Sequence, residues 1–375
     1  MAELYIGLIS GTSIDAIDAV LADFGGAPQV VATASYSFPE QVRKELHTIC
    51  NSGICPMDKL GELDRQLGLL FGTAVNKLLE SAGVKRADVR AIGSHGQTIH
   101  HAPHGEIRYT IQIGDPNTIA ELTGITTVAD FRRRDIAAGG QGAPLVPPFH
   151  AAAFRSTGHD RVVLNIGGIA NITVLPRDAA QPVIGFDTGP GNGLLDAWVQ
   201  KHRGEPFDRS GAWAASGKVD TALLKSLLKD GYFDKDPPKS TGREYFNLAW
   251  LEHHLTGSAS SEKEDVQATL CELTAITIAQ DIRQYAPATK QIMVCGGGAY
   301  NSALMKRLAT LMSDCEVTST ANYGIAPDWI EATAFAWLAR ATLGGQAGNL
   351  PSVTGAHHAV VLGGIYAGNR SQDRY

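Results

Sequence analysis

Asp187 lies in the stretch GFDTGPGNGLLDAW, where a short apolar run meets a Thr-Gly-Pro-Gly turn before a helical pattern begins. A carboxylate acts as a general base when it is held within hydrogen-bonding distance of a water or hydroxyl, and such catalysis contributes about 10² to 10⁴ in rate. Turns rich in Gly and Pro also favour Asp for local reasons, because its side chain hydrogen-bonds the turn backbone. Composition and spacing alone leave both interpretations open.

Three Gly-rich turns elsewhere in the chain could bind an anion. They are GTSIDAID at 11–18, GGIAN at 167–171 and CGGGAYN at 295–301. Backbone N–H groups in such turns, placed at strand ends or helix starts, can surround a phosphate. In the first turn Asp15 and Asp18 could hold Mg²⁺, directly or through water. The turns together predict a nucleoside triphosphate site.

The stretch HGQTIHHAPHGE at 95–106 is rich in histidine. His100 and His104 have the spacing of a helical metal pair, but Pro103 disfavours a helix there, so we do not expect a metal site. His95 directly follows the apolar run VRAIGS. It is either a buried core histidine or a group that hydrogen-bonds a substrate.

Two further motifs place charges next to apolar runs. In ADFRRRD, strand-like alternation would turn Arg132 and Arg134 to one side and Arg133 to the other. An arginine fork suits a substrate carboxylate, although such a run is also typical of a solvated edge. Glu331 opens the apolar helical pattern at 330–343, where it either interacts with the helix dipole or contacts a substrate.

The segment KSTGRE at 239–244 follows Asp-Pro-Pro in a polar stretch that is typical of a loop. Its Lys239 and Arg243 are compatible with ordinary surface charges. The sequence assigns neither of them a role.

A repeated order of elements positions these residues. Each half of the chain opens with three predicted strands, at 4–9, 16–24 and 29–38 in the first half and at 162–166, 172–175 and 182–187 in the second. A helical pattern follows in each half and ends at Gly83 and Gly204, respectively. Short apolar runs then alternate with helical patterns, which indicates an α/β fold. Two such halves facing each other would bring the Gly-rich turns to one cleft.

Length and charge restrict the class of protein. A chain of 375 residues predicts about two domains, and 44% hydrophobic with 19% charged residues is typical of a globular protein. The net charge of -6 argues against nucleic acid as a partner and favours a small molecule. The start MAELYIGLIS lacks the positive charge of a signal peptide, and no apolar stretch reaches the length of a membrane span. We therefore expect a cytoplasmic protein without a membrane partner.

The three turns together resemble those of the actin, Hsp70 and hexokinase superfamily, with GTSIDAID similar to its first phosphate loop, LNIGGIANIT to its second and CGGGAYN to its adenosine loop. Within that superfamily, these motifs and GSHGQTI, QIGDP, ADFRRRD, AAGGQGAPLVP, FDTGPGN and KSTGRE resemble the anhydro-N-acetylmuramic acid kinases. The resemblance implies an α/β fold of two duplicated, ribonuclease-H-like lobes around a central nucleotide and sugar cleft. The first lobe would contain 1–155 and 345–375, and the second 156–344.

The resemblance also implies an activity. The enzyme would use ATP, Mg²⁺ and water to open the ring of 1,6-anhydro-N-acetylmuramic acid and phosphorylate O6, giving N-acetylmuramic acid 6-phosphate and ADP in peptidoglycan recycling and amino-sugar catabolism. Asp187 becomes the base that activates water, and a homodimer is expected. The implied sugar contacts are His95, Gln97, Thr98, Arg132, Arg134 and Glu331. The implied nucleotide contacts are Gly11, Thr12, Ser13, Ile14, Asp15, Ala16, Ile17, Asp18, Gly167, Gly168, Gly296, Gly297, Gly298 and Asn301, with Asp15 and Asp18 beside Mg²⁺.

The sequence departs from the family pattern at two positions. Ala16 stands where the family usually has Gly, and Gly193 where a larger apolar residue is common. Because alanine with a positive φ is strained, we expect either a negative φ at Ala16 or a slightly different loop. Two other functions stay open: a nucleotide-driven conformational switch, and a plain sugar kinase that acts on a free hydroxyl.

Overall fold

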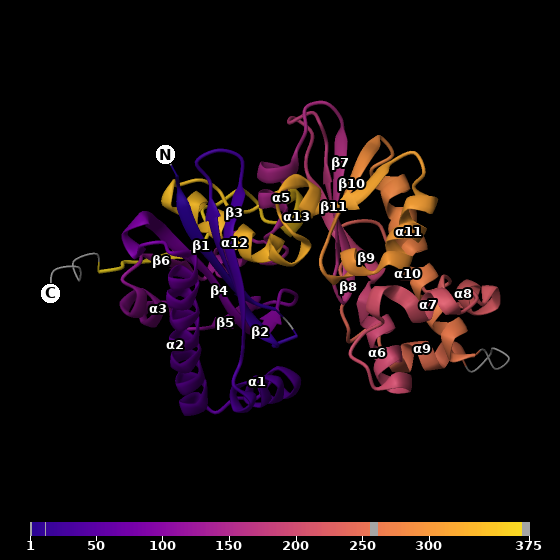
Figure 1. Ribbon diagram of the computed structural model, residues 1–375, viewed down its shortest axis with the longest axis horizontal. Coiled ribbons are helices and arrows are strands. Elements are labelled where there is room, and N and C mark those ends of the chain that lie inside the picture. The colour runs from indigo at the N-terminus through magenta and orange to yellow at the C-terminus, as the bar shows by residue number, and fades with distance from the viewer. Residues whose placement is uncertain (1, 12, 256–261, 370–375) are drawn as a thin grey trace. The chain divides into compact units, whose positions relative to one another are not determined.

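The computed structural model describes residues 2–11, 13–255 and 262–369 (Figure 1). Thr12, one of the implied nucleotide contacts, lies outside the described residues. None of the helices within these ranges combines the length and the apolar character that a membrane crossing requires.

The chain forms two compact units. Unit 1 contains Met1–Ala153 and Trp329–Tyr375, and unit 2 contains Phe154–Asp328. The expected return to the first lobe at residue 345 is therefore wrong. The chain returns at Trp329, so that helix α12 (Ile330–Leu343) belongs to unit 1, where it packs against four strands of the sheet.

Unit 1 is built on a mixed sheet with the strand order β12-β6-β4-β1-β2-β3, to which β5 adds through β4. The strands β1, β2 and β3 form an antiparallel meander, and β4 and β6 run parallel to β1. Their bounds are β1 Leu4–Ser10, β2 Ala16–Asp23, β3 Gln29–Ser37, β4 Val89–Ala102, β5 Tyr109–Ile113, β6 Thr127–Ala129 and β12 Gly364–Tyr366.

Unit 2 repeats this order. Its sheet runs β11-β10-β7-β8-β9, with β7, β8 and β9 as an antiparallel meander and β10 and β11 parallel to β7. The bounds are β7 Asp160–Ile166, β8 Ile169–Leu175, β9 Ile184–Pro190, β10 Thr289–Cys295 and β11 Glu316–Ser319. In both sheets the third, second, first and fourth strands lie side by side, followed by one more parallel strand, β6 in unit 1 and β11 in unit 2. This shared order confirms the α/β fold and its duplication.

Helices cover both faces of the first sheet. The long helix α2 (Met57–Ala82) packs on one face together with α1 (Glu40–Ser52), and it ends at Gly83 in the left-handed conformation, as the sequence predicts. Helix α12 lies on the other face, because β1 turns Ile6 and Leu8 toward α2 and the intervening Gly7 toward α12. The shorter helices of this unit are α3 Pro116–Thr123, α4 Phe131–Ala137 and α13 Pro351–Thr354, and α5 Pro147–Phe154 spans the boundary between the units.

Two glycines allow α12 to approach the sheet closely. A Cβ atom added at Gly7 would lie 1.8 Å from the carbonyl oxygen of Ala332, and one added at Gly93 would lie 1.9 Å from that of Phe335. No other residue type fits at these contacts, since real Cβ atoms do not approach another heavy atom so closely. The contact fixes the start of α12, and with it Glu331, over the sheet.

In unit 2 the central helix α10 (Lys263–Tyr285) packs against β8 and β9 and forms much of the core (Figure 1). The other helices are α6 Asn192–Arg203, α7 Ala212–Ser216, α8 Thr221–Leu227, α9 Leu248–Leu255 and α11 Ser302–Leu311. Helix α6 ends at Gly204 in the left-handed conformation, which confirms the predicted stop. Single turns of 3-10 helix lie at Arg86–Asp88, Arg209–Gly211, Gly297–Tyr300, Thr320–Tyr323 and Pro327–Trp329.

Candidate functional site

Two of the Gly-rich turns lie side by side in unit 2. They follow the neighbouring parallel strands β7 and β10, in which Asn165 pairs with Cys295. Gly296 has a φ of 75°, and a Cβ atom added at Gly298 would lie 2.4 Å from the Cβ of Ile166. The turns need glycine for conformation and for close packing. The structure thus brings GGIAN and CGGGAYN together at the carboxyl edge of the sheet, where α/β proteins bind ligands.

The GGIAN turn also holds the start of α6. The N–H groups of Gly191 and Gly193 each donate to the carbonyl oxygen of Gly168 at 3.0 Å, and that of Asn192 donates to Gly167 at 2.7 Å. A Cβ atom at Gly193 would lie 2.8 Å from the oxygen of Gly168. Gly193 therefore suits a turn that is tighter than a larger residue would permit. These N–H groups of α6 are engaged by the turn itself.

Asn301, an implied nucleotide contact, caps a helix. Its side-chain oxygen accepts a hydrogen bond of 3.1 Å from the N–H of Leu304, and the residue is 9% exposed. Asn301 is a favourable N-cap residue for this reason. Asn301 follows the CGGGAY turn directly, and its side-chain oxygen caps the N-terminus of α11.

Asp187 lies in β9 and is fixed by three hydrogen bonds to the segments around it. Its own N–H donates to the carbonyl oxygen of Lys239 at 3.1 Å, and its carbonyl oxygen accepts from the hydroxyl of Tyr232 at 2.7 Å. The N–H of Thr241 donates to the carboxylate oxygen Oδ2 at 3.0 Å. Asp187 is therefore part of a strand, and both its backbone and its carboxylate are held in position.

The environment of Asp187 suits proton transfer. Burial raises the pKa of its carboxyl group from 3.8 to about 6, and the nearby carboxylate of Glu244 adds to this effect. The hydrogen bond from Thr241 acts in the opposite direction, because it stabilises the charged form. A carboxylate with a pKa of about 6 is ionised at neutral pH and close enough to it to be an effective general base.

The two charges of KSTGRE have different surroundings. Arg243 is exposed and lies against the GGIAN turn, since a Cβ atom at Gly168 would be 2.5 Å from its Nε. It also faces Asp196, whose pKa is raised to about 6 mainly by burial, with Arg243 opposing the rise. Lys239 is only 6% exposed and forms an ion pair with Asp281. The interpretation as a surface charge is therefore correct for Arg243 and wrong for Lys239.

The first phosphate turn, in unit 1, has an unusual conformation. Ile14 has a φ of 56° although its side chain is 2% exposed, and its N–H donates to the carbonyl oxygen of Gly11 at 3.1 Å. A β-branched residue in this region is strained. Ala16 starts the extended strand β2, where it pairs with Ser37, and has no positive φ. Ala16 is therefore not strained, and the strained backbone conformation in this turn is that of Ile14.

His95 holds an arginine in place. Its Nε2 accepts a hydrogen bond of 2.9 Å from Nε of Arg132, so its proton is on Nδ1, which lies 3.0 Å from the carbonyl oxygen of Gly96. Burial, together with the charge of Arg132, keeps the pKa of His95 well below its usual value. His95 also packs on the ring of Phe335, at 4.7 Å between centroids. It is a neutral, buried residue that positions Arg132.

The three arginines of ADFRRRD do not alternate as expected, because they lie in helix α4 rather than in an extended segment. Successive residues of a helix point about 100° apart, so Arg132 and Arg134 do not share a side. Arg132 is directed inward and also donates from Nη1 to the carbonyl oxygen of Gly142 at 2.8 Å. Arg133 pairs with Asp130 at 3.1 Å, and Arg134 is exposed. The prediction that groups Arg132 with Arg134 is wrong.

Asp18, Arg132 and Glu331 interact electrostatically within unit 1. The pKa of Glu331 is raised by the surrounding protein and by the charge of Asp18, while Arg132 opposes the rise. Its side chain nevertheless remains open to solvent. Burial lowers the pKa of Arg132 to about 10, so this guanidinium stays charged. The strand β2 and the helices α4 and α12 thus bring together one predicted metal ligand and two predicted sugar contacts.

The remaining predicted metal and sugar contacts have other surroundings. Asp15 is exposed in the turn before β2. Within the described ranges, no three His, Cys, Asp or Glu side chains are grouped to hold a metal. Gln97 is 1% exposed and accepts a hydrogen bond of 2.5 Å from the hydroxyl of Ser10, which braces the end of β1. Thr98 is turned toward β5, where its hydroxyl accepts from Gln112 at 3.0 Å. Gln97 and Thr98 thus face different partners.

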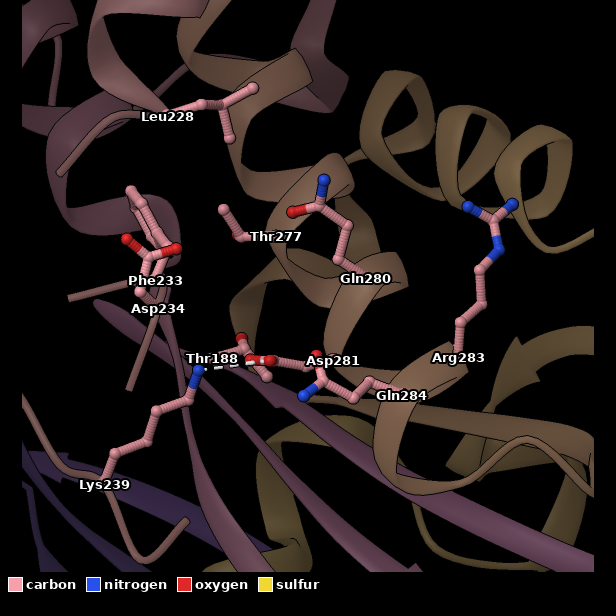
Figure 2. Close-up of a pocket in the computed structure, with 10 residues that line it drawn as sticks. All are labelled: Thr188, Leu228, Phe233, Asp234, Lys239, Thr277, Gln280, Asp281, Arg283 and Gln284. Carbon is pink, nitrogen blue, oxygen red and sulfur yellow. Dashed lines mark hydrogen bonds and ion pairs between the residues drawn. The ribbon is translucent and has the colours of Figure 1, made fainter. Parts of the chain in front are cut away.

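A cavity of about 560 Å³ in unit 2 was not anticipated from the sequence (Figure 2). Thr188 lines it next to Asp187 in β9, and the ion pair of Lys239 and Asp281 forms part of its wall. The motif KSTGRE is the one sequence signal that could have found it. Nothing in the sequence connects that motif with Asp281 on α10.

The two units share one strand order, and Gly-rich turns follow their first strands. With a buried carboxylate of raised pKa at the strand edge, they define an ATP-dependent phosphotransferase of duplicated α/β fold. The family model described as anhydro-N-acetylmuramic acid kinase matches residues 3–368, and the chain belongs to this family. It is 53% identical over 364 residues to the anhydro-N-acetylmuramic acid kinase of Shewanella sp. (strain ANA-3), covering 97% of this chain and 98% of the relative. The enzyme of that name from Shewanella loihica is 52% identical over 366 residues, covering 97% and 99%.

Solved structures show a more distant likeness. The (R)-2-hydroxyglutaryl-CoA dehydratase component A of Acidaminococcus fermentans aligns with a TM-score of 0.48 at 11% identity, covering 89% of this chain and 96% of that one. A ROK family glucokinase from Streptomyces griseus, solved with glucose and AMPPNP, aligns with a TM-score of 0.40 at 14% identity, covering 90% of this chain and 99% of that one. At these scores the fold assignment depends on the strand order of the chain itself.

Proposed function

We propose that this kinase uses Asp187 as the base for the hydrolytic and phosphoryl-transfer reaction of its family. A water molecule gives a proton to Asp187 while its oxygen attacks the anomeric carbon of 1,6-anhydro-N-acetylmuramic acid. The bond from that carbon to O6 breaks, and O6 forms a bond to the γ-phosphorus of ATP, with ADP as the leaving group. Asp187 then releases its proton to solvent. The single observation that supports this role is a residue beside the GGIAN turn whose carboxyl group has a pKa of about 6 and whose backbone and carboxylate are held by Tyr232 and the segment 239–241.

The Gly-rich turns fit a nucleotide. In GGIAN and CGGGAYN the turns have no room for a side chain at Gly168 and Gly296, where an added Cβ atom would lie within 2.5 Å of Arg243 Nε and Asn165 Oδ1, respectively. Such turns present N–H groups to phosphate oxygens. We assign the phosphates to GGIAN and GTSIDAID, and the adenosine to CGGGAYN.

Mg²⁺ fits the carboxylates of the first turn, since hard cations prefer oxygen ligands and keep waters and phosphate oxygens in their shell. When bound, it would neutralise charge on the transferring phosphoryl group. Asp18 is the better candidate ligand, because it is partly buried and interacts with Glu331, whereas Asp15 is exposed in the turn. Asp18→Asn should raise the Mg²⁺ concentration needed for half-maximal turnover, while Asp15→Asn should change it less. Equal effects would argue against this assignment.

The sugar would contact Arg132 and Glu331. A guanidinium has five N–H donors, and its bonds to His95 and Gly142 use two of its nitrogens, so the fork can still offer donors to the lactyl carboxylate. Glu331 would accept hydrogen bonds from sugar hydroxyls. The surrounding protein and the charge of Asp18 raise the pKa of the Glu331 carboxyl group.

Isotope labelling tests the reaction. Products formed from ATP and 1,6-anhydro-N-acetylmuramic acid in ¹⁸O water are identified by mass spectrometry. We expect phosphate on the sugar and ¹⁸O at its anomeric position. Phosphorylated sugar without ¹⁸O would indicate a plain kinase acting on a free hydroxyl, and ADP without phosphorylated sugar would indicate a conformational switch.

The proposal includes a homodimer in the cytoplasm, for which the support is the family resemblance. Light scattering at several protein concentrations gives the mass of the particle in solution. A mass near twice that of one chain is expected, and a mass of one chain at all concentrations would contradict it.

A further inference from the structure

Lys239 and Asp281 form a buried ion pair beside the proposed base. The distance from Nζ of Lys239 to Oδ1 of Asp281 is 3.1 Å, and the side chains are 2% and 9% exposed. Figure 2 shows the lysine reaching from its loop toward the aspartate on α10. Two charges at this depth are costly to dehydrate, and a buried pair of this kind contributes less to stability than to holding one arrangement.

The surroundings of the ammonium group are aromatic on two sides. Nζ of Lys239 lies 5.6 Å from the ring centre of Phe186 and 5.5 Å from that of Tyr232. Both rings belong to the immediate environment of Asp187, since Phe186 precedes it in β9 and Tyr232 donates to its carbonyl oxygen. The cation is therefore attracted to the same groups that surround the proposed base.

The backbone of the same segment contacts Asp187. The carbonyl oxygen of Lys239 accepts from the N–H of Asp187, and two residues further on the N–H of Thr241 donates to its carboxylate. The segment between them cannot move without loss of both bonds. Its side-chain anchor in unit 2 is the ion pair with Asp281.

We propose that the Lys239–Asp281 ion pair is a positioning device for the base. It anchors the segment 239–241 to α10, so that Thr241 holds the carboxylate of Asp187 in one orientation. The inference rests on the proposed function, in which Asp187 is the base. Lys239 and Asp281 are positioning residues, because they act on the carboxylate through the backbone.

Loss of the anchor should alter the titration of Asp187. The charged and titratable groups around it are Glu244, which raises its pKa, and Tyr232, whose own pKa is raised by burial, by Asp187 and by Asp281. The bond from Thr241 is the one contribution that lowers the pKa of Asp187. Without it, the acidic limb of the kcat profile should move to higher pH than about 6.

The cavity provides an independent test. Lys239 and Asp281 both line the space of about 560 Å³, and Oδ2 of Asp281 has no hydrogen-bond partner within the described part of the chain. A small primary ammonium ion can enter such a space and pair with the aspartate. This ion is not bonded to the segment 239–241, so it restores the charge but not the anchor, and Lys239→Ala should not regain turnover when n-propylammonium is added.

The first experiment compares Lys239→Met, Asp281→Asn and the double variant, with Lys229→Met as control, because Lys229 is an exposed lysine of the same unit. We expect kcat to fall about 100-fold in each single variant, as for a misplaced catalytic group, with little change in the KM for ATP. The acidic limb should move upward in each, and the control should match the wild type. Circular dichroism and thermal unfolding confirm that the variants fold.

The double variant separates positioning from charge balance. It contains neither buried charge, so it should recover stability, yet we expect the same loss of kcat and the same shifted limb as in the single variants. Recovery of kcat in the double variant would overturn the proposal, because the pair would then only neutralise itself.

Asp187→Asn distinguishes the two levels of inference. If this variant keeps near-normal turnover, the proposed function fails. If it is inactive while Lys239→Met keeps the wild-type kcat and pH profile, only the positioning role fails. Turnover of Lys239→Ala that stays low in n-propylammonium supports the positioning role, because the free ion restores only the charge. A rise of at least tenfold with n-propylammonium, but not with tetramethylammonium, contradicts it.

Discussion

Asp187→Asn should lower activity and raise stability at the same time. Asparagine has nearly the shape of aspartate and can still accept the hydrogen bond from Thr241, but it cannot take a proton from water. We expect kcat to fall by about 10² to 10⁴, the usual contribution of a general base. The KM for ATP should change little, since the Gly-rich turns are unaltered.

The stability change can be estimated from the pKa. Burial raises the pKa of Asp187 from 3.8 to about 6. The folded chain therefore binds this proton more tightly than the unfolded chain, and folding loses stability as the pH rises from about 4 to about 6. A difference of about 2.2 in pKa corresponds to about 3 kcal/mol. The variant lacks this cost, so above pH 6 it should be more stable than the wild type by up to about 3 kcal/mol.

Urea denaturation at several pH values measures this gain. The difference between variant and wild type should be small at pH 4, grow to pH 6 and remain constant at higher pH. The pH profile of wild-type kcat should show an acidic limb near 6, because only ionised Asp187 accepts the proton. A variant that is less stable than the wild type at pH 7.5 would refute the electrostatic reasoning. Near-normal turnover would refute the role as a base.

Three further substitutions test the positions of other groups. Arg132→Lys should raise the KM for the sugar about 10- to 100-fold, because a lysine cannot form the paired hydrogen bonds of a guanidinium. The control Arg134→Lys should match the wild type in steady-state kinetics. Similar KM values for the two variants would contradict the assignment of Arg132. Gly7→Ala should lower the free energy of unfolding by more than about 3 kcal/mol, because the added methyl group overlaps α12. The control Gly61→Ala, in an open part of α2, should raise the free energy of unfolding by up to about 1 kcal/mol. A Gly7→Ala variant as stable as the wild type would refute the close contact. Ala16→Gly should keep kcat within about twofold of the wild type. It should lower the free energy of unfolding, measured by urea denaturation, by about 0.5 to 1 kcal/mol, since this residue starts a strand. A large change in kcat would show that the turn depends on Ala16.

The sequence predicts most strands and helix ends, because local patterns determine them. Gly83 and Gly204 stop their helices through a left-handed backbone that any sequence reading can anticipate. The helix α4 was missed, because seven residues with three arginines have no apolar period to indicate it. The boundary near Trp329 was missed for another reason. An apolar helix such as α12 can cover either sheet, and its choice depends on the close contact at Gly7.

The candidate site is less accessible to sequence reasoning. Asp187 is recognisable as a polar residue in a Gly-Pro turn, but its raised pKa arises from burial that only the folded chain creates. Lys239 is inconspicuous in a polar loop, because its partner Asp281 is 42 residues away on α10. The sequence motifs indicate His95 and Arg132 separately, but the hydrogen bond between them depends on α4 being helical.

The division of the chain affects the order in which it can fold during synthesis. Unit 2 is one uninterrupted stretch of 175 residues, Phe154–Asp328, inserted between the two segments of unit 1. A ribosome that adds about 5 to 20 residues per second needs about 9 to 35 s to make such a stretch. Throughout that time the early sheet of unit 1 lacks α12, so the face around Gly7 and Gly93 stays uncovered. The unit that begins first is therefore completed last, and one face of its sheet stays exposed to solvent until α12 has been made.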